Sequence, residues 1–100
     1  MTNELNFLEK LYKTIEKKAE GNDNSSYTKS LIKNGKNKIA QKLGEESSEL
    51  IVDYLNGSKK RTIEEASDLI YHLFVLLYSK KIKLNDLKKE LKKRENVQRK

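Results

Sequence analysis

Apolar residues recur every three or four positions along most of this chain, a spacing typical of amphipathic helices. The first such stretch covers about residues 3–20, and its apolar stripe consists of Leu5, Leu8, Tyr12, Ile15 and Ala19. Glycine and asparagine follow in the run 21–24, which is typical of a loop. The pattern therefore predicts a first helix that ends near Glu20.

A short second helix is expected between this loop and Gly35. Ser25 or Ser26 can cap its N-terminus, because serine hydroxyls accept hydrogen bonds from the first free backbone N–H groups. Gly35 can end it after Asn34, since glycine is favoured just beyond a helix. Three residues are predicted to face inward: Tyr27, Leu31 and Ile32.

Three further helices follow, at about 37–56, 62–80 and 85–95. The third is predicted to face the core through Ile39, Leu43, Leu50 and Tyr54. The fourth is apolar on nearly every side along 69–78, which is typical of a buried helix. The stripe expected for the fifth consists of Leu84, Leu87 and Leu91.

The chain has no proline, and Lys, Glu and Leu, which are good helix formers, dominate it. We therefore predict an all-α fold, a bundle of about five helices in one domain over residues 1–100, with a basic tail at about 95–100. A domain of 100 residues buries only about two-thirds of its unfolded surface, so a partner subunit is expected to complete the core.

Two short acidic blocks lie within the third and fourth helices. In the first, Glu46 and Glu49 stand three positions apart and share a helix face. In the second, Glu65 and Asp68 do the same. Between them Asn56-Gly57 marks a turn, and helices joined by a short loop usually run antiparallel. We expect the two acidic faces to meet.

Carboxylates that converge in this way repel one another unless a cation lies among them. Mg²⁺ suits such a site, because it is a hard ion that prefers oxygen ligands and is often shared with substrate phosphates. It can serve as Lewis acid and template in the cleavage of a phosphoanhydride. The blocks therefore predict a magnesium site that handles polyphosphates.

Each block taken alone also has a purely structural explanation. A solvated helix face with salt bridges accounts for Glu46 and Glu49. A capping box that begins at Thr62 accounts for Glu65. Neither explains Asp68, a full turn inside the helix, and the two blocks together favour the metal site.

Three other residues near the blocks have two readings each. Lys42, one turn before the first block, is either an ion-pair partner within the helix or a phosphate anchor. His72 is either a hydrogen-bonded core histidine or a contact of Asp68 or of a phosphate. Gly44 costs about 1 kcal/mol relative to Ala inside a helix, which suggests a kink or a close approach there.

The net charge of +7 allows a nucleic-acid partner, and residues 83–100 are heavily basic. Lysine on solvated helix faces also accounts for this positive charge, and the charge would equally suit a small substrate rich in phosphate. A non-enzymatic nucleic-acid-binding module is disfavoured, because acidic faces without a metal repel phosphate backbones. No apolar run is long enough to span a bilayer. We expect a cytoplasmic protein without membrane or nucleic-acid partners.

Several runs together resemble a known enzyme family: Ser26-Tyr27-Thr28, the stretch from Ile39 to Glu49, and the stretch from Glu65 to Leu73. They are similar to phosphoribosyl-ATP pyrophosphohydrolases, which belong to the MazG-like all-α nucleotide pyrophosphohydrolases. The resemblance covers about 5–94. It implies Mg²⁺-dependent hydrolysis of phosphoribosyl-ATP to phosphoribosyl-AMP and pyrophosphate, the second step of histidine biosynthesis, by a homodimer.

The resemblance also implies roles for individual residues. The carboxylates at the family's metal-binding positions are Glu46, Glu49, Glu65 and Asp68. Glu45 matches an acid that orients or deprotonates the attacking water, and Glu46 lies beside it. Lys42 and His72 match positions near the phosphates or behind the metal ligands. Three residues lie in the segment expected to approach the substrate: Tyr27, Thr28 and Lys36.

Departures from the family pattern are few. Serines stand at three positions where small residues, commonly alanine, are expected: Ser47, Ser48 and Ser67. Many relatives are fused to the cyclohydrolase of the next step, and we expect that step to belong to another protein here. A house-cleaning nucleoside triphosphate pyrophosphatase of the same superfamily is the alternative function, with the same metal site and a different pocket for base and sugar.

Overall fold

A computed structural model describes residues 6–95, which form five helices and contain no strand. The helices are α1 (Asn6–Glu20), α2 (Tyr27–Asn34), α3 (Lys36–Asn56), α4 (Lys59–Ser79) and α5 (Leu84–Glu95). The predicted all-α fold is confirmed. Leu5, the expected start of the first helix at residue 3 and the tail beyond Glu95 lie outside the described residues.

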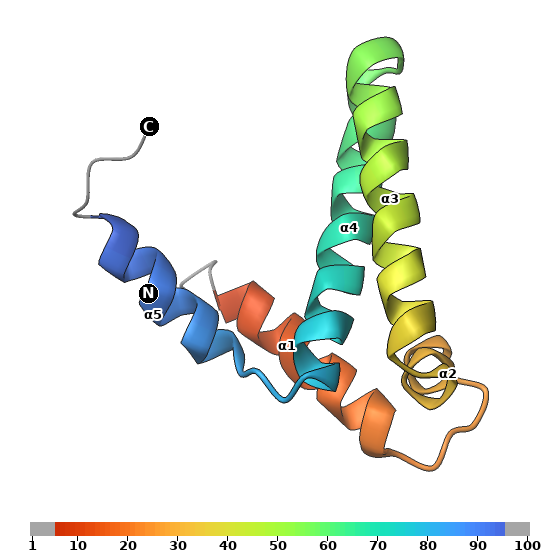
Figure 1. Cartoon of the computed structure of the whole chain (residues 1–100), viewed down its shortest axis with the longest axis vertical. Coiled ribbons are helices and arrows are strands. Elements are labelled where there is room, and N and C mark those ends of the chain that lie inside the picture. The colour runs from red at the N-terminus through yellow and green to blue at the C-terminus, as the bar shows by residue number, and fades with distance from the viewer. Residues whose placement is uncertain (1–5, 96–100) are drawn as a thin grey trace.

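The α3–α4 hairpin dominates the architecture. The two helices run antiparallel and pack along their length, α1 and α2 lie at the open end of the hairpin, and α5 extends away from it beside α1 (Figure 1). Gly35 joins α2 to α3 with a φ of 95°, a left-handed conformation that glycine adopts without steric cost. This sharp junction sets α2 across the base of α3.

Serine side chains cap the N-termini of two helices, α2 and α4. The Ser26 hydroxyl accepts a hydrogen bond of 3.2 Å from the Lys29 N–H at the start of α2. Ser58 accepts one of 3.1 Å from the Arg61 N–H and caps α4. Thr62, expected to begin this helix, lies inside it and donates to the Ser58 carbonyl. The capping-box explanation for Glu65 is therefore wrong.

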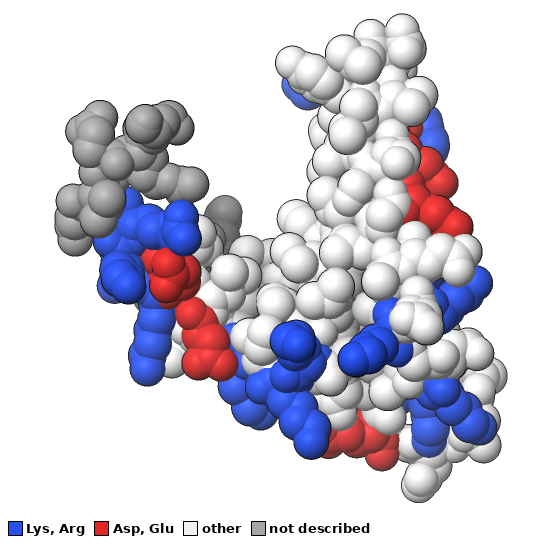
Figure 2. All heavy atoms as spheres, in the orientation of Figure 1, with Lys and Arg blue, Asp and Glu red and all other residues white. Residues whose placement is uncertain are grey.

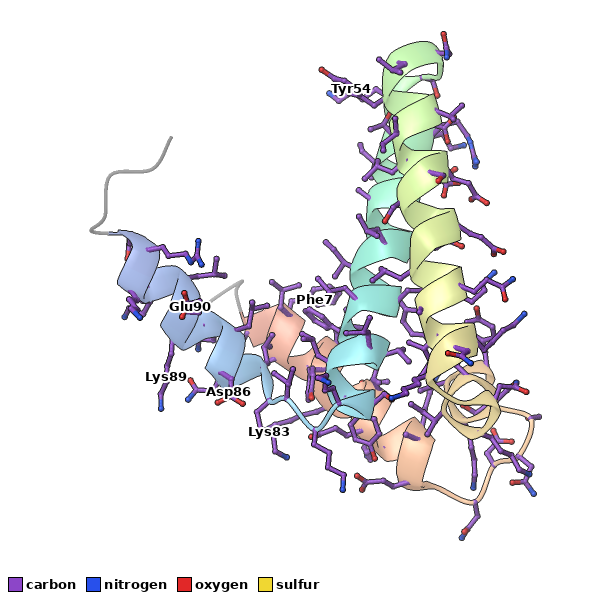
Figure 3. The ribbon with its side chains drawn as sticks, in the orientation of Figure 1. Phe7, Tyr54, Lys83, Asp86, Lys89 and Glu90 are labelled. Carbon is purple, nitrogen blue, oxygen red and sulfur yellow. The ribbon has the colours of Figure 1, made fainter. Side chains whose placement is uncertain are left out.

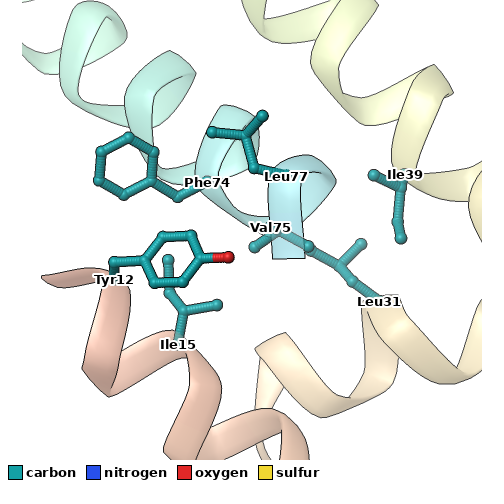
Figure 4. Close-up of a cluster of buried hydrophobic side chains, with 7 residues drawn as sticks. All are labelled: Tyr12, Ile15, Leu31, Ile39, Phe74, Val75 and Leu77. Atoms are coloured by element: carbon teal, nitrogen blue, oxygen red, sulfur yellow. The ribbon is translucent and has the colours of Figure 1, made fainter. Parts of the chain in front are cut away.

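The buried core lies at the base of the hairpin, where α1 and α2 cover α3 and α4 (Figure 4). Tyr12 meets Phe74 edge to face, with ring centroids 5.8 Å apart. The buried apolar side chains are Tyr12, Ile15, Leu31, Ile39, Phe74, Val75 and Leu77. The predicted stripe residues that contribute to this core or pack against it are Tyr12, Ile15, Leu31, Ile32, Ile39, Leu84 and Leu87.

Four residues predicted to face inward are exposed instead, and two of them, Leu8 and Leu91, belong to the stripes of the first and last helices. Tyr27 is 49% exposed at the start of α2, and Tyr54 is 74% exposed near the closed end of the hairpin. Figure 3 shows Tyr54 projecting away from both helices. It belongs to an exposed group that we call the apolar tip, which consists of Ile51, Val52, Tyr54, Leu55 and Ile63. This group lies beyond the reach of α1 and α2.

Helix α5 contacts α1 through ion pairs, while Leu84 and Leu87 pack against the core. Lys88 Nζ is 2.9 Å from Glu9 Oε2, and Lys83 Nζ is 3.4 Å from Glu16 Oε2. The Tyr12 hydroxyl donates to the Ile82 carbonyl just before α5. No helix between residues 6 and 95 combines the length and the hydrophobicity that a membrane span requires.

Candidate metal centre

Three of the predicted carboxylates converge between α3 and α4. Glu46 and Glu49 from α3 and Glu65 from α4 each offer one oxygen, and these oxygens lie within 4.8 Å of one another. Glu46 and Glu65 are 7% and 4% exposed, whereas Glu49 is exposed. In Figure 2, acidic side chains gather along one edge of the hairpin, while much of the rest of its visible face is uncharged. The expected meeting of the two acidic faces is confirmed for these three residues.

The electrostatics of this cluster favour the arrival of a cation. Burial raises the pKa of Glu65, and a hydrogen bond with Glu49 and the charge of that residue raise it further. Glu46 Oε1 and Glu65 Oε1 are both buried without a hydrogen-bond partner among the described residues. Buried polar atoms in proteins are nearly always paired, and hard divalent cations take carboxylate oxygens as ligands. The donor set therefore fits Mg²⁺.

Asp68 lies near this cluster but is not one of the three converging groups. Its side chain is exposed, and its charge adds to the rise in the pKa of Glu65. Its backbone carbonyl accepts a hydrogen bond of 2.8 Å from His72 Nδ1. His72 thus contacts the main chain of Asp68 through this bond.

His72 joins α4 to α2. A carbonyl can only accept, so Nδ1 donates in this bond. The Tyr27 hydroxyl lies 2.9 Å from Nε2 and forms a hydrogen bond with it. His72 is therefore a buried, hydrogen-bonded histidine, and its contact with Asp68 is to the backbone carbonyl; a role toward phosphate stays a prediction.

The two predicted substrate residues in α2 have different surroundings. The Tyr27 ring stacks on Tyr71, with centroids 6.1 Å apart and an interplanar angle of 21°, and half of its surface is open. Thr28 is buried, and its hydroxyl pairs with that of Tyr71. Tyr27 can therefore touch a ligand directly, while Thr28 supports Tyr71 from within.

Lys42 and Glu45 form a charged pair beside the cluster. Lys42 Nζ lies 3.3 Å from Glu45 Oε1 and 3.9 Å from Glu46 Oε2. Glu45 also accepts a 2.9 Å hydrogen bond from Gln41 Nε2. Hydrogen bonds from Gln41 and then Lys42 lower the pKa of Glu45. The Glu45 carboxylate is therefore ionised near neutral pH and is a weaker base than a free one.

Two sequence predictions near the cluster have different outcomes. Lys36 begins α3, about 15 Å along the helix axis from Glu46, and it lines a separate cavity with Lys80. The structure does not bring it to the carboxylates. Gly44 has no close neighbour, because a side chain there would meet no described atom within 4 Å. No other described segment of this chain therefore approaches Gly44 closely, and the alternative expectation of a kink stays a prediction.

Arg61 is a charged residue of this region that the motif reading missed. Its Nη2 is 2.7 Å from Glu65 Oε2 and 3.6 Å from Asp53 Oδ2, and its Nη1 is 2.8 Å from Glu64 Oε1. A sequence signal existed, because Glu64 and Glu65 follow Arg61 at the helical spacings of three and four. The contact with α3 depends on how the two helices pack.

Comparisons with known proteins find similar sequences over most of the chain. The family model described as phosphoribosyl-ATP pyrophosphohydrolase matches residues 8–95. The chain is 46% identical over 89 residues to the phosphoribosyl-ATP pyrophosphatase of Sulfolobus acidocaldarius, covering 89% of this chain and 94% of the relative. It is 42% identical over 90 residues to that of Clostridium novyi, covering 90% and 82%.

A bifunctional relative is matched over part of its length. The histidine biosynthesis bifunctional protein HisIE of Bacteroides thetaiotaomicron is 48% identical over 88 residues, which cover 88% of this chain and 43% of the relative. The chain thus spans less than half of this bifunctional protein and nearly all of the Sulfolobus one.

Proposed function

Because the chain belongs to the phosphoribosyl-ATP pyrophosphohydrolase family, we propose that it hydrolyses phosphoribosyl-ATP to phosphoribosyl-AMP and pyrophosphate. This reaction is the second step of histidine biosynthesis, and relatives carry that pathway in their names. The convergence of Glu46, Glu49 and Glu65 within 4.8 Å supports the proposal most directly. A polyphosphate that carries Mg²⁺ binds to proteins through carboxylates of this kind, which share the ion with the phosphates.

Glu46, Glu49 and Glu65 would hold Mg²⁺, with Asp68 as a fourth donor from the next turn of α4. The two buried oxygens without partners, one on Glu46 and one on Glu65, support this assignment. When bound, the ion supplies Lewis-acid neutralisation of phosphate charge and a template for in-line attack. Two rigid helices hold the donors, so little reorganisation is needed when substrate arrives.

Other residues of the chain act on the substrate and on water. Lys42 lies 3.9 Å from Glu46, where its ammonium can balance phosphate charge. Glu45 is exposed and ionised, which suits a group that orients the attacking water. Tyr27 presents an aromatic face beside the site and is held there by His72. Lys36 contacts the substrate only if the ligand extends along α3 toward the base of the hairpin.

We also propose that the protein is a homodimer assembled through the apolar tip. Its five side chains are each more than half exposed, and a group of this kind marks an interaction surface. Sedimentation analysis of Leu55→Glu against the wild type tests this. A wild-type monomer at micromolar concentration would refute it.

A cytoplasmic location is proposed too, because phosphorylated nucleotides do not cross membranes freely.

The decisive experiment measures pyrophosphate release from phosphoribosyl-ATP by EDTA-treated protein, with and without added Mg²⁺. We expect turnover that requires the ion and is lost in Glu46→Gln. The control Glu90→Gln, which changes a carboxylate on α5, should retain it. Turnover of ordinary or damaged nucleoside triphosphates in place of phosphoribosyl-ATP would identify a house-cleaning enzyme. Salt-sensitive nucleic-acid binding without turnover would identify a binding module.

A further inference from the structure

The guanidinium of Arg61 occupies the edge of the acidic cluster. It makes its shortest contact, 2.7 Å, with Glu65, a residue that we assign to the metal ion. A second carboxylate on the same helix, Glu64, is 2.8 Å away. The third, Asp53, belongs to α3. Arg61 therefore ties the two helices together at the place where a divalent cation is expected.

We propose that Arg61 is a resident counter-ion that competes with the metal ion for Glu65. This inference rests on the metal site proposed above. Glu65 is 4% exposed, one of its oxygens has no hydrogen-bond partner, and Glu49 lies against it. Without a divalent ion, the positive charge that Arg61 places on Glu65 offsets this repulsion.

A metal ion that binds Glu65 meets a positive charge already in place. The two cations repel each other, so each must weaken the hold of the other on the carboxylate. This antagonism is reciprocal, because a coupling free energy between two sites acts equally in both directions. Arg61 thereby reduces the affinity of the cluster for Mg²⁺ and stabilises the cluster when the ion is absent.

Arg61 has other carboxylate partners that can hold its guanidinium when Glu65 binds a metal ion. Its side chain is 54% exposed, so it can turn outward without disturbing the core. Glu64 and Asp53 lie outside the group of three converging carboxylates. Both can stay paired with the guanidinium after Glu65 has bound a metal ion. The arginine fork suits this exchange, since it binds two carboxylates at once.

The test compares Mg²⁺ binding to metal-free protein by titration calorimetry, without substrate, for wild type, Arg61→Gln and Lys60→Gln. Lys60 is the exposed neighbour of Arg61 and forms no ion pair with residues 6–95. Its substitution removes the same charge without the contact. We expect Arg61→Gln to bind Mg²⁺ about fivefold more tightly than wild type, at the low end of typical couplings. Lys60→Gln should change the affinity by less than about twofold, because salt screens exposed charges.

Thermal unfolding supplies a second readout. In EDTA, Arg61→Gln should melt at a lower temperature than Lys60→Gln, and saturating Mg²⁺ should close that gap. Arg61→Lys keeps the charge without the fork, and its Mg²⁺ affinity should fall between those of wild type and Arg61→Gln. Equal or weaker Mg²⁺ binding by Arg61→Gln relative to Lys60→Gln overturns the competition while leaving the metal site standing. If wild type binds no Mg²⁺, the metal site itself fails and the competition with it.

Discussion

The Glu46→Gln substitution tests the metal assignment without changing the shape of the site. The side chain is 7% exposed and one of its oxygens has no partner, so glutamine fills the same space. It removes one of the negative charges that repel each other in the metal-free cluster. We therefore expect the variant to fold and, in EDTA, to melt at or slightly above the wild-type temperature. The expected loss is confined to stabilisation by Mg²⁺.

Its size follows from linkage between binding and folding. At a Mg²⁺ concentration of about ten times Kd, binding stabilises the native state by about 1.4 kcal/mol. For a domain of this size that corresponds to a rise in Tm of about 6–11 °C. Loss of a residue that supports a metal ligand weakens metal binding by about 10–100-fold. We expect loss of a ligand itself to lie at the upper end of this range, where the rise at the same concentration falls below about 1 °C.

The assay is thermal unfolding followed by circular dichroism, in EDTA and in Mg²⁺. Protein concentration is held fixed, since the Tm of an oligomer depends on it. Glu90→Gln, which removes the partner of Arg94 on α5, is the matched control and should keep the full rise. A Glu46→Gln variant that gains as much from Mg²⁺ as wild type would refute the assignment of this carboxylate to the metal.

Three further outcomes are expected. Ile15 is 1% exposed, so Ile15→Ala should lower the free energy of unfolding by about 2–5 kcal/mol. Leu91→Ala on the exposed face of α5 should lower it by less than about 0.5 kcal/mol. Equal losses for the two variants in denaturant titrations would contradict the assigned core. Burial, followed by the hydrogen bond to Glu20, raises the pKa of Tyr78 from 10.0 to about 12. The folded state therefore holds the Tyr78 proton more firmly than the unfolded state does. The resulting contribution of Tyr78 to the free energy of unfolding is complete below about pH 10 and disappears as the pH rises toward 12. Unfolding titrations of Tyr78→Phe should lack this loss, and an identical alkaline decline in both proteins would exclude Tyr78 as its source. Ser58→Ala should destabilise the protein by about 1 kcal/mol through loss of the α4 cap, while Ser58→Asp should retain the stability; equal effects of the two changes would show that the cap is not used.

The parts of the fold that the sequence predicted are those set by local spacing. Apolar residues at three and four positions located all five helices, because a helix brings such residues to one face whatever surrounds it. The same rule paired the carboxylates within each acidic block. The start of α4 was misplaced because Ser58 and Thr62 are both able to cap a helix. Ser58 is the cap in the structure, where its hydroxyl accepts from the Arg61 N–H.

The features that the sequence did not reveal depend on how helices pack. Arg61 could be paired with Glu64 and Glu65 from spacing alone, but its approach to Asp53 requires the rotation of α4 against α3. Likewise, the bond between Tyr27 and His72 joins residues 45 positions apart. Its existence follows from where Gly35 turns the chain and sets α2. Such contacts are fixed by tertiary geometry, which periodicity does not encode.

Tyr54 illustrates a different limit. Its position in the stripe of α3 predicted that it faces the core, yet the side chain is 74% exposed. Periodicity shows which face of a helix avoids water, but it does not show which neighbour covers that face. In this chain α1 and α2 cover only the base of the hairpin, so Tyr54 is exposed at the tip together with Ile51 and Leu55, which lie outside the predicted stripe. Burial predicted from the stripe and exposure in one subunit are consistent if a second copy covers the tip, because the free energy that favours burial is the same whether the covering helix belongs to the same chain or to another.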